Sequence, residues 1–195
     1  MKKKTIALVL ACVICVGIGI GGTLAWLTAT TDDVTNTFTT SDINITLAET
    51  KTDFKMVPGC TIEKDPKVTV LKDSEKCYLF VKLQKSSNFD SFMTYTVADG
   101  WTQLTGVPGV NNVYYRVVDA DTANDQSFYV IKDNTVTVSG DVTKANMNAL
   151  TAATYPTLTV TAYASQYYQT NDTPFDVATA WANAQPSSGS SEPTP

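Results

Sequence analysis

Few residues in this chain of 195 are of a type that does chemistry. It contains no histidine, which excludes the Ser-His-Asp and Cys-His catalytic arrangements and a His-ligated zinc site. Its only arginine is Arg116, although arginine is the usual side chain for recognising phosphates and bases. The chain is also acidic, with a pI of about 4.6. This composition argues against nucleic acid as a partner.

Oxygen-bearing side chains gather in one loop that contains Asp119, Asp121, Asn124 and Asp125. Such a loop is either a calcium site or a solvated acidic turn. An EF-hand loop needs glycine and glutamate at two positions where this chain has Asn124 and Val130. We therefore expect no catalytic, cofactor-binding or metal-binding residue, and we do not expect an enzyme.

The chain has four cysteines, and two of them, Cys12 and Cys15, lie in an N-terminal apolar run. The other two, Cys60 and Cys77, lie in the rest of the chain. Two cysteines in an exported protein usually pair. We therefore expect a Cys60–Cys77 disulfide, and the alternative is two free thiols on separate strands.

The N-terminus resembles a secretory signal peptide. A basic start at Lys2-Lys3-Lys4 precedes an apolar run from Ile6 to Gly22 and a small-x-small site at Thr23-Leu24-Ala25. We expect cleavage between Ala25 and Trp26, and the alternative is an uncleaved membrane anchor. The mature protein is then secreted, to the extracellular matrix or the cell surface. Membrane contact is expected only through the uncleaved signal segment.

Four parts follow from this processing. They are a signal peptide (1–25), an N-terminal extended segment (26–40), a β domain (41–185) and a Pro/Ser/Gly-rich disordered tail (186–195). Of the eight or nine short strands expected in the β domain, apolar alternation and β-branched or aromatic content predict five. Their ranges are 42–47, 67–71, 77–85, 113–118 and 157–164.

Turn signals predict how some strands connect. A charged turn joins 67–71 to 77–85, Asp99-Gly100 joins 94–97 to 101–104, and Asp133-Asn134 joins 128–132 to 135–138. Each of these is expected to be a hairpin, and the first would bring the two cysteines together.

Helical signals are shorter. We expect a helical turn at 88–93 and a helix at 141–150. A capping box from Thr173 to Asp176, with Pro174 at the first helical position, predicts a helix that ends near Asn183. The predicted fold class is all-β, an antiparallel jelly-roll-like sandwich with two short helices.

Several motifs resemble the TasA/camelysin family. They are Gly22-Thr23-Leu24-Ala25-Trp26-Leu27-Thr28, Asn36-Thr37-Phe38, Asp42-Ile43-Asn44-Ile45-Thr46-Leu47 and Cys77-Tyr78-Leu79-Phe80-Val81-Lys82. The resemblance implies processing by a SipW-type signal peptidase, a jelly-roll fold and a role as a secreted fibre or biofilm-matrix subunit. Some family members are described as metalloproteases. This chain lacks the His-Glu-x-x-His signature of that activity.

The segment after the expected cleavage site predicts how such a subunit assembles. It is rich in threonine and contains the β-forming residues Trp26, Leu27, Val34 and Phe38. A free extended end can add to the unpaired sheet edge of a second copy, so we expect self-association into fibres. The alternative is that this segment is an ordinary first strand of its own subunit. A monomeric exported binding or adhesion domain is the alternative function.

Overall fold

A computed structural model describes residues 42–185 of the chain. The predicted signal peptide, its cleavage site at Ala25 and Trp26, and the C-terminal tail lie outside the described residues. The possible donor residues Trp26, Leu27, Val34 and Phe38 lie outside them as well. The described residues correspond to the predicted β domain, apart from its first residue.

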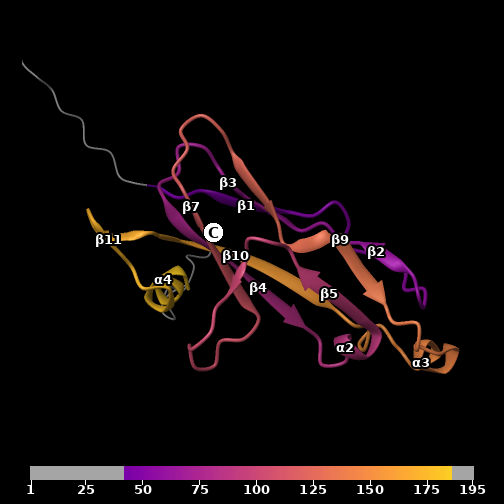
Figure 1. Ribbon diagram of the computed structural model, residues 1–195. Coiled ribbons are helices and arrows are strands. Elements are labelled where there is room, and N and C mark those ends of the chain that lie inside the picture. Colours follow the sequence, from indigo (N-terminus) through magenta and orange to yellow (C-terminus); the bar gives the residue numbers. More distant parts are fainter. Residues whose placement is uncertain (1–41, 186–195) are drawn as a thin grey trace, which may run out of the picture. The chain divides into compact units, whose positions relative to one another are not determined.

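The described residues form twelve strands and three short helices (Figure 1). The strands are β1 (Ile45–Ala48), β2 (Thr61–Glu63), β3 (Lys67–Val70), β4 (Cys77–Lys85), β5 (Met93–Val97), β6 (Thr102–Gln103), β7 (Val113–Val118), β8 (Gln126–Tyr129), β9 (Ile131–Val138), β10 (Leu158–Gln166), β11 (Tyr168–Thr170) and β12 (Thr173–Pro174). The helices are α2 (Phe89–Phe92), α3 (Lys144–Asn148) and α4 (Val177–Ala184).

All strand pairs are antiparallel, which confirms the all-β class. One sheet has the order β1-β3-β8, a second β10-β4-β7-β6 and a third β2-β9-β5. Strands β11 and β12 form a separate pair. The predicted strands 67–71, 77–85, 113–118 and 157–164 are all present, and β4 has the predicted bounds.

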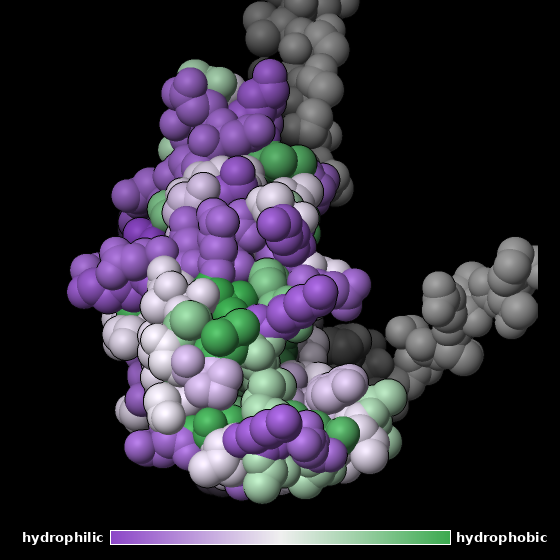
Figure 2. Space-filling model, turned by 90° about the vertical axis from the view of Figure 1, so that its right-hand side faces the viewer, coloured by the Kyte–Doolittle hydropathy of each residue, from purple (hydrophilic) through white to green (hydrophobic). Residues whose placement is uncertain are grey.

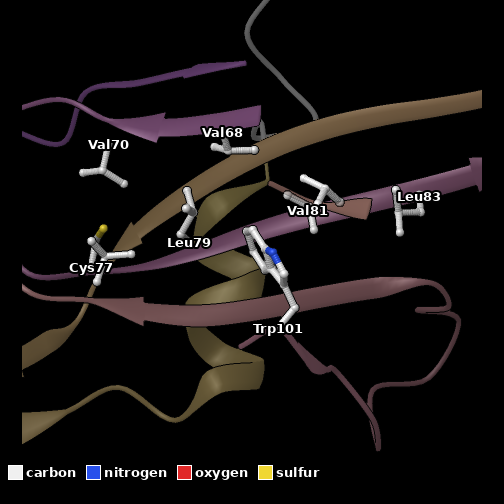
Figure 3. Close-up of a cluster of buried hydrophobic side chains, with 9 residues drawn as sticks. Val68, Val70, Cys77, Leu79, Val81, Leu83 and Trp101 are labelled. Atoms are coloured by element: carbon white, nitrogen blue, oxygen red, sulfur yellow. The ribbon is translucent and has the colours of Figure 1, made fainter. Parts of the chain in front are cut away.

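Strand β4 packs one face against the β1-β3-β8 sheet. Cys77, Leu79, Val81 and Leu83 alternate along it and are all fully buried, as the apolar alternation predicted. They meet Val68 and Val70 of β3, together with Trp101, which reaches toward Leu79 and Val81 (Figure 3). We call this cluster the intersheet core. It joins the first two sheets face to face.

The other face of β4 is also buried, because helix α4 covers it. The Phe80 ring lies 5.3 Å from that of Trp181, centroid to centroid, and the Tyr163 ring lies 5.2 Å from Trp181. The Tyr78 hydroxyl donates a hydrogen bond of 2.9 Å to the Phe175 carbonyl just before the helix. An aromatic layer thus holds α4 on the second sheet.

A third apolar cluster belongs to the β2-β9-β5 sheet. Phe89 and Phe92 of α2 pack on Ile131, Val136 and Val138 of β9. The Tyr95 ring packs edge-on against Phe89, and burial raises the pKa of the Tyr95 hydroxyl to about 12. The short helix at 88–93 was therefore predicted correctly, and it covers one face of this sheet.

The predicted hairpin between 67–71 and 77–85 is wrong. Strand β3 pairs with β1 and β8, whereas β4 pairs with β10 and β7. The charged turn forms, with Asp73 at a φ of 64°, but it carries the chain from one sheet to the other. Since β4 is apolar on both faces, it lies at the centre of a covered sheet instead of beside β3.

The other two predicted hairpins are also wrong. Asp99-Gly100 does form a turn, with Gly100 at a φ of 85°, yet β5 pairs with β9 and β6 pairs with β7. Asp133 and Asn134 have positive φ values of 55° and 53°, but they lie inside the single strand β9. The β5–β9 register shifts at this point, so the two residues form an irregularity within one strand.

The predicted cap of the last helix is three residues too early. Thr173 and Pro174 form β12, which pairs with β11. The helix begins after Asp176, whose side chain accepts a hydrogen bond of 3.2 Å from the Thr179 N–H. The helix expected at 141–150 is shortened to α3, and Thr143 and Asn146 form its capping box.

The expected Cys60–Cys77 disulfide is absent, and both cysteines are free thiols. Cys60 is exposed, and its carbonyl accepts a hydrogen bond from Val138 of β9. Cys77 is buried in the intersheet core and pairs with Val118 and Gln166. Because the first predicted hairpin does not form, nothing brings the two cysteines together.

Thiol labelling tests this correction. We expect iodoacetamide at pH 8 to modify Cys60 in the folded mature chain and to leave Cys77 unmodified, because burial raises the pKa of the Cys77 thiol to about 11. Intact-mass spectrometry should show one adduct in buffer and two in guanidinium chloride. A mass two hydrogens lower, with no adduct in either condition, would restore the disulfide.

The aromatic layer predicts a large loss of stability when Trp181 is truncated. We expect Trp181→Ala to lower the free energy of unfolding by about 3–5 kcal/mol, because it opens a cavity over Phe80. Guanidinium chloride unfolding measures the change. Tyr155→Ala is the matched control, since Tyr155 is 55% exposed, and it should cost well under about 1 kcal/mol. Equal losses would argue against this packing.

Candidate functional site

Strand β10 is the longest strand at a sheet edge in residues 42–185. Its nine residues, with the sequence LTVTAYASQ, pair with β4 along one side in an unbroken register. Natural sheets usually protect such an edge by keeping it short or by placing lysine, proline or a bulge in it. β10 has no charged residue, no proline and no break in register.

Two hydrogen bonds at its ends define which residues of β10 bond to β4. The Ser86 N–H donates to the Thr157 carbonyl (3.0 Å), and the Tyr167 N–H donates to the Lys76 carbonyl (3.1 Å). In an antiparallel pair, backbone groups point toward the partner at every second residue. The odd-numbered residues Thr159, Thr161, Tyr163 and Ser165 therefore bond to β4.

The even-numbered residues point their backbone groups away from β4. They are Leu158, Val160, Ala162, Ala164 and Gln166. The side chains of the first four pack against the intersheet core. Their N–H and C=O groups form a row along the open side of the sheet, and no bond from that row to another element is found among the described residues. This row can accept a further strand.

Side chains partly cover the opposite side of the same two sheets. The Trp101 indole N–H donates to the Tyr129 carbonyl of β8 (2.9 Å), which occupies an outward-facing acceptor. The Arg116 guanidinium lies 3.8 Å from the Phe128 ring centre and 5.4 Å from that of Trp101. Burial in this stack lowers the Arg116 pKa. These side chains partly cover the side that holds β8, and β8 has only four residues.

The remaining edges of the described sheets are short. β1 has four residues, β2 three, β5 five and β6 two. Strand β1 lies against β10, so the outer edges of the first and second sheets lie on the same side. On this side Ile43 and Ile45 pack against the intersheet core, whereas Leu47 is 40% exposed. The open side thus combines backbone groups with partly exposed apolar surface.

The acidic loop is a self-bonded turn. Asp121 accepts hydrogen bonds from the Ala123 and Asn124 N–H groups at 2.7 and 3.0 Å, and these bonds lower its pKa. The Lys76 ammonium contacts Asp119 at 2.8 Å, and the Lys72 N–H donates to Asp125. Within residues 42–185, no three histidine, cysteine or acidic side chains are grouped to hold a metal ion.

Sequence reasoning found the strand but not its role. The alternation of Leu158, Val160, Ala162 and Ala164 predicted a strand with one buried face. Its position at an edge depends on which distant strands take the places beside β4, and no local pattern encodes that. The possible donor residues lie outside the described part of the chain.

Comparisons of the chain with protein-family models, with curated proteins and with solved structures find no match. The TasA/camelysin resemblance therefore stays a prediction. In the described part of the chain, no helix has the length and apolar character needed to cross a bilayer.

Amide hydrogen exchange tests the open edge. In a variant that lacks residues 26–38, we expect the amides of Val160 and Ala162 to exchange about tenfold or more faster than those of Thr161 and Tyr163, since only the latter bond to β4. Residue-resolved exchange by NMR measures the rates. Equal protection of both sets would contradict an open edge.

Proposed function

We propose that this protein is a secreted structural protein, a TasA-like subunit of extracellular-matrix or biofilm fibres, and that it assembles by β-strand addition after signal-peptide cleavage. In this proposal the sheets close as a jelly-roll-like sandwich, and a SipW-type signal peptidase releases the N-terminus. The role of the chain is structural, not catalytic. One observation carries the proposal: the unprotected edge of β10.

The edge supports strand addition because its backbone groups are regularly spaced and the strand has no charged side chain. An added strand would bond to the outward N–H and C=O groups between Leu158 and Gln166. It would also cover apolar side chains that are only partly buried there, such as Val160 and Leu158. Hydrogen bonding and apolar burial thus favour the same event.

The donor in this proposal is the segment at 26–38 of a second copy. A donor from the same copy would have to reverse direction between Phe38 and the start of β1. The Asp42 and Asn44 carbonyls already accept hydrogen bonds from the Glu75 and Leu71 N–H groups. The turn would therefore fall on Thr39-Thr40-Ser41, which include no Gly, Pro, Asn or Asp. An extended exit toward another subunit is therefore favoured, and it gives open head-to-tail assembly.

A pair of proline substitutions tests the edge. Ala162→Pro removes an outward N–H and leaves the β4–β10 bonds in place, so the mature chain should stay folded and remain in the supernatant at every concentration. Thr161→Pro is the matched variant, because it removes a bond to β4 and should lower stability by roughly 1–3 kcal/mol. Sedimentation, electron microscopy and near-UV circular dichroism measure assembly and folding.

Deletion of residues 26–38 gives the complementary result, and it should abolish fibres of a folded subunit. Fibre formation by Ala162→Pro equal to that of the unaltered chain would overturn β10 as the acceptor. A mature chain that stays monomeric at all concentrations would instead favour the binding or adhesion domain.

A further inference from the structure

An apolar groove of about 760 Å³ lies beside the β2-β9-β5 sheet. Figure 2 faces the part of the described chain that carries α2, α3 and β2, and hydrophobic residues gather there among hydrophilic ones. The apolar lining comes from several elements. It includes Phe54, Met56, Ile62, Met147, Tyr155 and Leu158.

The lining is suited to receiving a side chain. Met56, Met93 and Met147 all contribute to it, and methionine adapts its shape to an inserted group and contacts aromatic rings favourably. Tyr155 is 55% exposed at this groove. The groove is also lined by Asp53, Lys55 and Lys64, which include both signs of charge, and Lys64 is paired with Glu49 at 2.7 Å. An apolar or aromatic occupant therefore fits better than a charged one.

The groove continues the open edge of β10. Leu158 and Thr159 begin that strand and also line the groove. A strand that adds along the outward groups of β10 would reach the groove at this end. The two features thus form one surface, with a backbone-recognising part and a side-chain pocket.

The chain enters the domain at the opposite end of β10. The Asp42 carbonyl accepts a hydrogen bond of 3.1 Å from the Glu75 N–H, two residues before β4 begins. The first residue of β4, Cys77, pairs with Gln166, the last residue of β10. The nine residues of β10 extend over about 30 Å, and this length separates Asp42 from the groove.

The distance between Asp42 and the groove determines which copy of the chain can supply a side chain to the groove. Four residues from Phe38 to Asp42 span at most about 14 Å, which is too short for Phe38 to reach the groove of its own copy. In head-to-tail assembly, the Asp42 end of one copy meets the groove end of the next. Phe38 is then the first large apolar residue of the preceding segment to arrive there.

We propose that the groove binds the Phe38 side chain of a second copy and so anchors and aligns the added strand. This inference rests on the proposed assembly by strand addition. The strand then runs antiparallel to β10, with Phe38 beside Leu158 and earlier residues toward Gln166.

Cross-linking of the mature chain tests this contact. In a Cys60→Ser background, Phe38→Cys combined with Tyr155→Cys should give a ladder of disulfide-linked oligomers under mild oxidation. Phe38→Cys combined with Val117→Cys is the matched control, because Val117 is 42% exposed but lies opposite Tyr78, near the other end of β4. The control should give no ladder.

The outcomes separate this inference from the proposed function. Fibres without a 38–155 cross-link would overturn the groove contact and leave strand addition standing. A cross-link confined to a single chain would overturn the second copy as the source. Absence of fibres of the unaltered mature chain at every concentration would overturn both proposals.

Truncation of the anchor gives an independent measure. We expect Phe38→Ala to raise the concentration needed for half-maximal assembly by roughly 10–100-fold, the range expected for losing one buried aromatic side chain. Thr37→Ala is the control, since its side chain points to the other face of an extended strand, and it should change that concentration by less than about threefold. Equal effects would overturn the anchor.

Discussion

A strand with apolar side chains on both faces has to be covered on both, and β4 is such a strand. Leu79 and Val81 face the intersheet core, while Tyr78 and Phe80 lie beneath α4. With β10 on one side and β7 on the other, the strand has neighbours in every direction. This constraint brings two sheets and a helix together, and it leaves β10 as the outermost strand of the second sheet.

The sequence predicted individual elements better than their pairing. The alternation from Cys77 to Lys85 located β4 and identified its inner face. The dipeptide Asp99-Gly100 located a real turn, but the strands on either side belong to different sheets. Turn chemistry is local, whereas pairing depends on which distant residues share a buried face. The disulfide was expected because two cysteines of an exported protein usually pair. The predicted hairpin that would have brought them together does not form, and both are free thiols.

For the candidate site, too, one part could be predicted from the sequence and the other could not. Composition alone marked the segment around Phe38 as a strand former, because β-branched and aromatic residues favour extended backbone. The acceptor strand, β10, could be identified only from the arrangement of the strands in the fold. A run such as that from Leu158 to Gln166 looks the same in sequence whether a neighbour lies on one side or on both. Only the order β10-β4-β7-β6 shows that β10 lies at an edge, and the stack of Arg116 on Phe128 partly covers the opposite side.

The alternation along β10 also bears on selectivity. The same residues that direct their peptide groups outward, such as Val160 and Ala162, direct their side chains into the interior. What an incoming polypeptide meets is thus mainly main chain, which is common to all proteins. The open edge of β10 therefore discriminates poorly between sequences. A filament built on this edge alone would admit foreign subunits and grow as a copolymer. Selectivity for copies of the same chain then has to come from shape-specific contacts at one end of this edge.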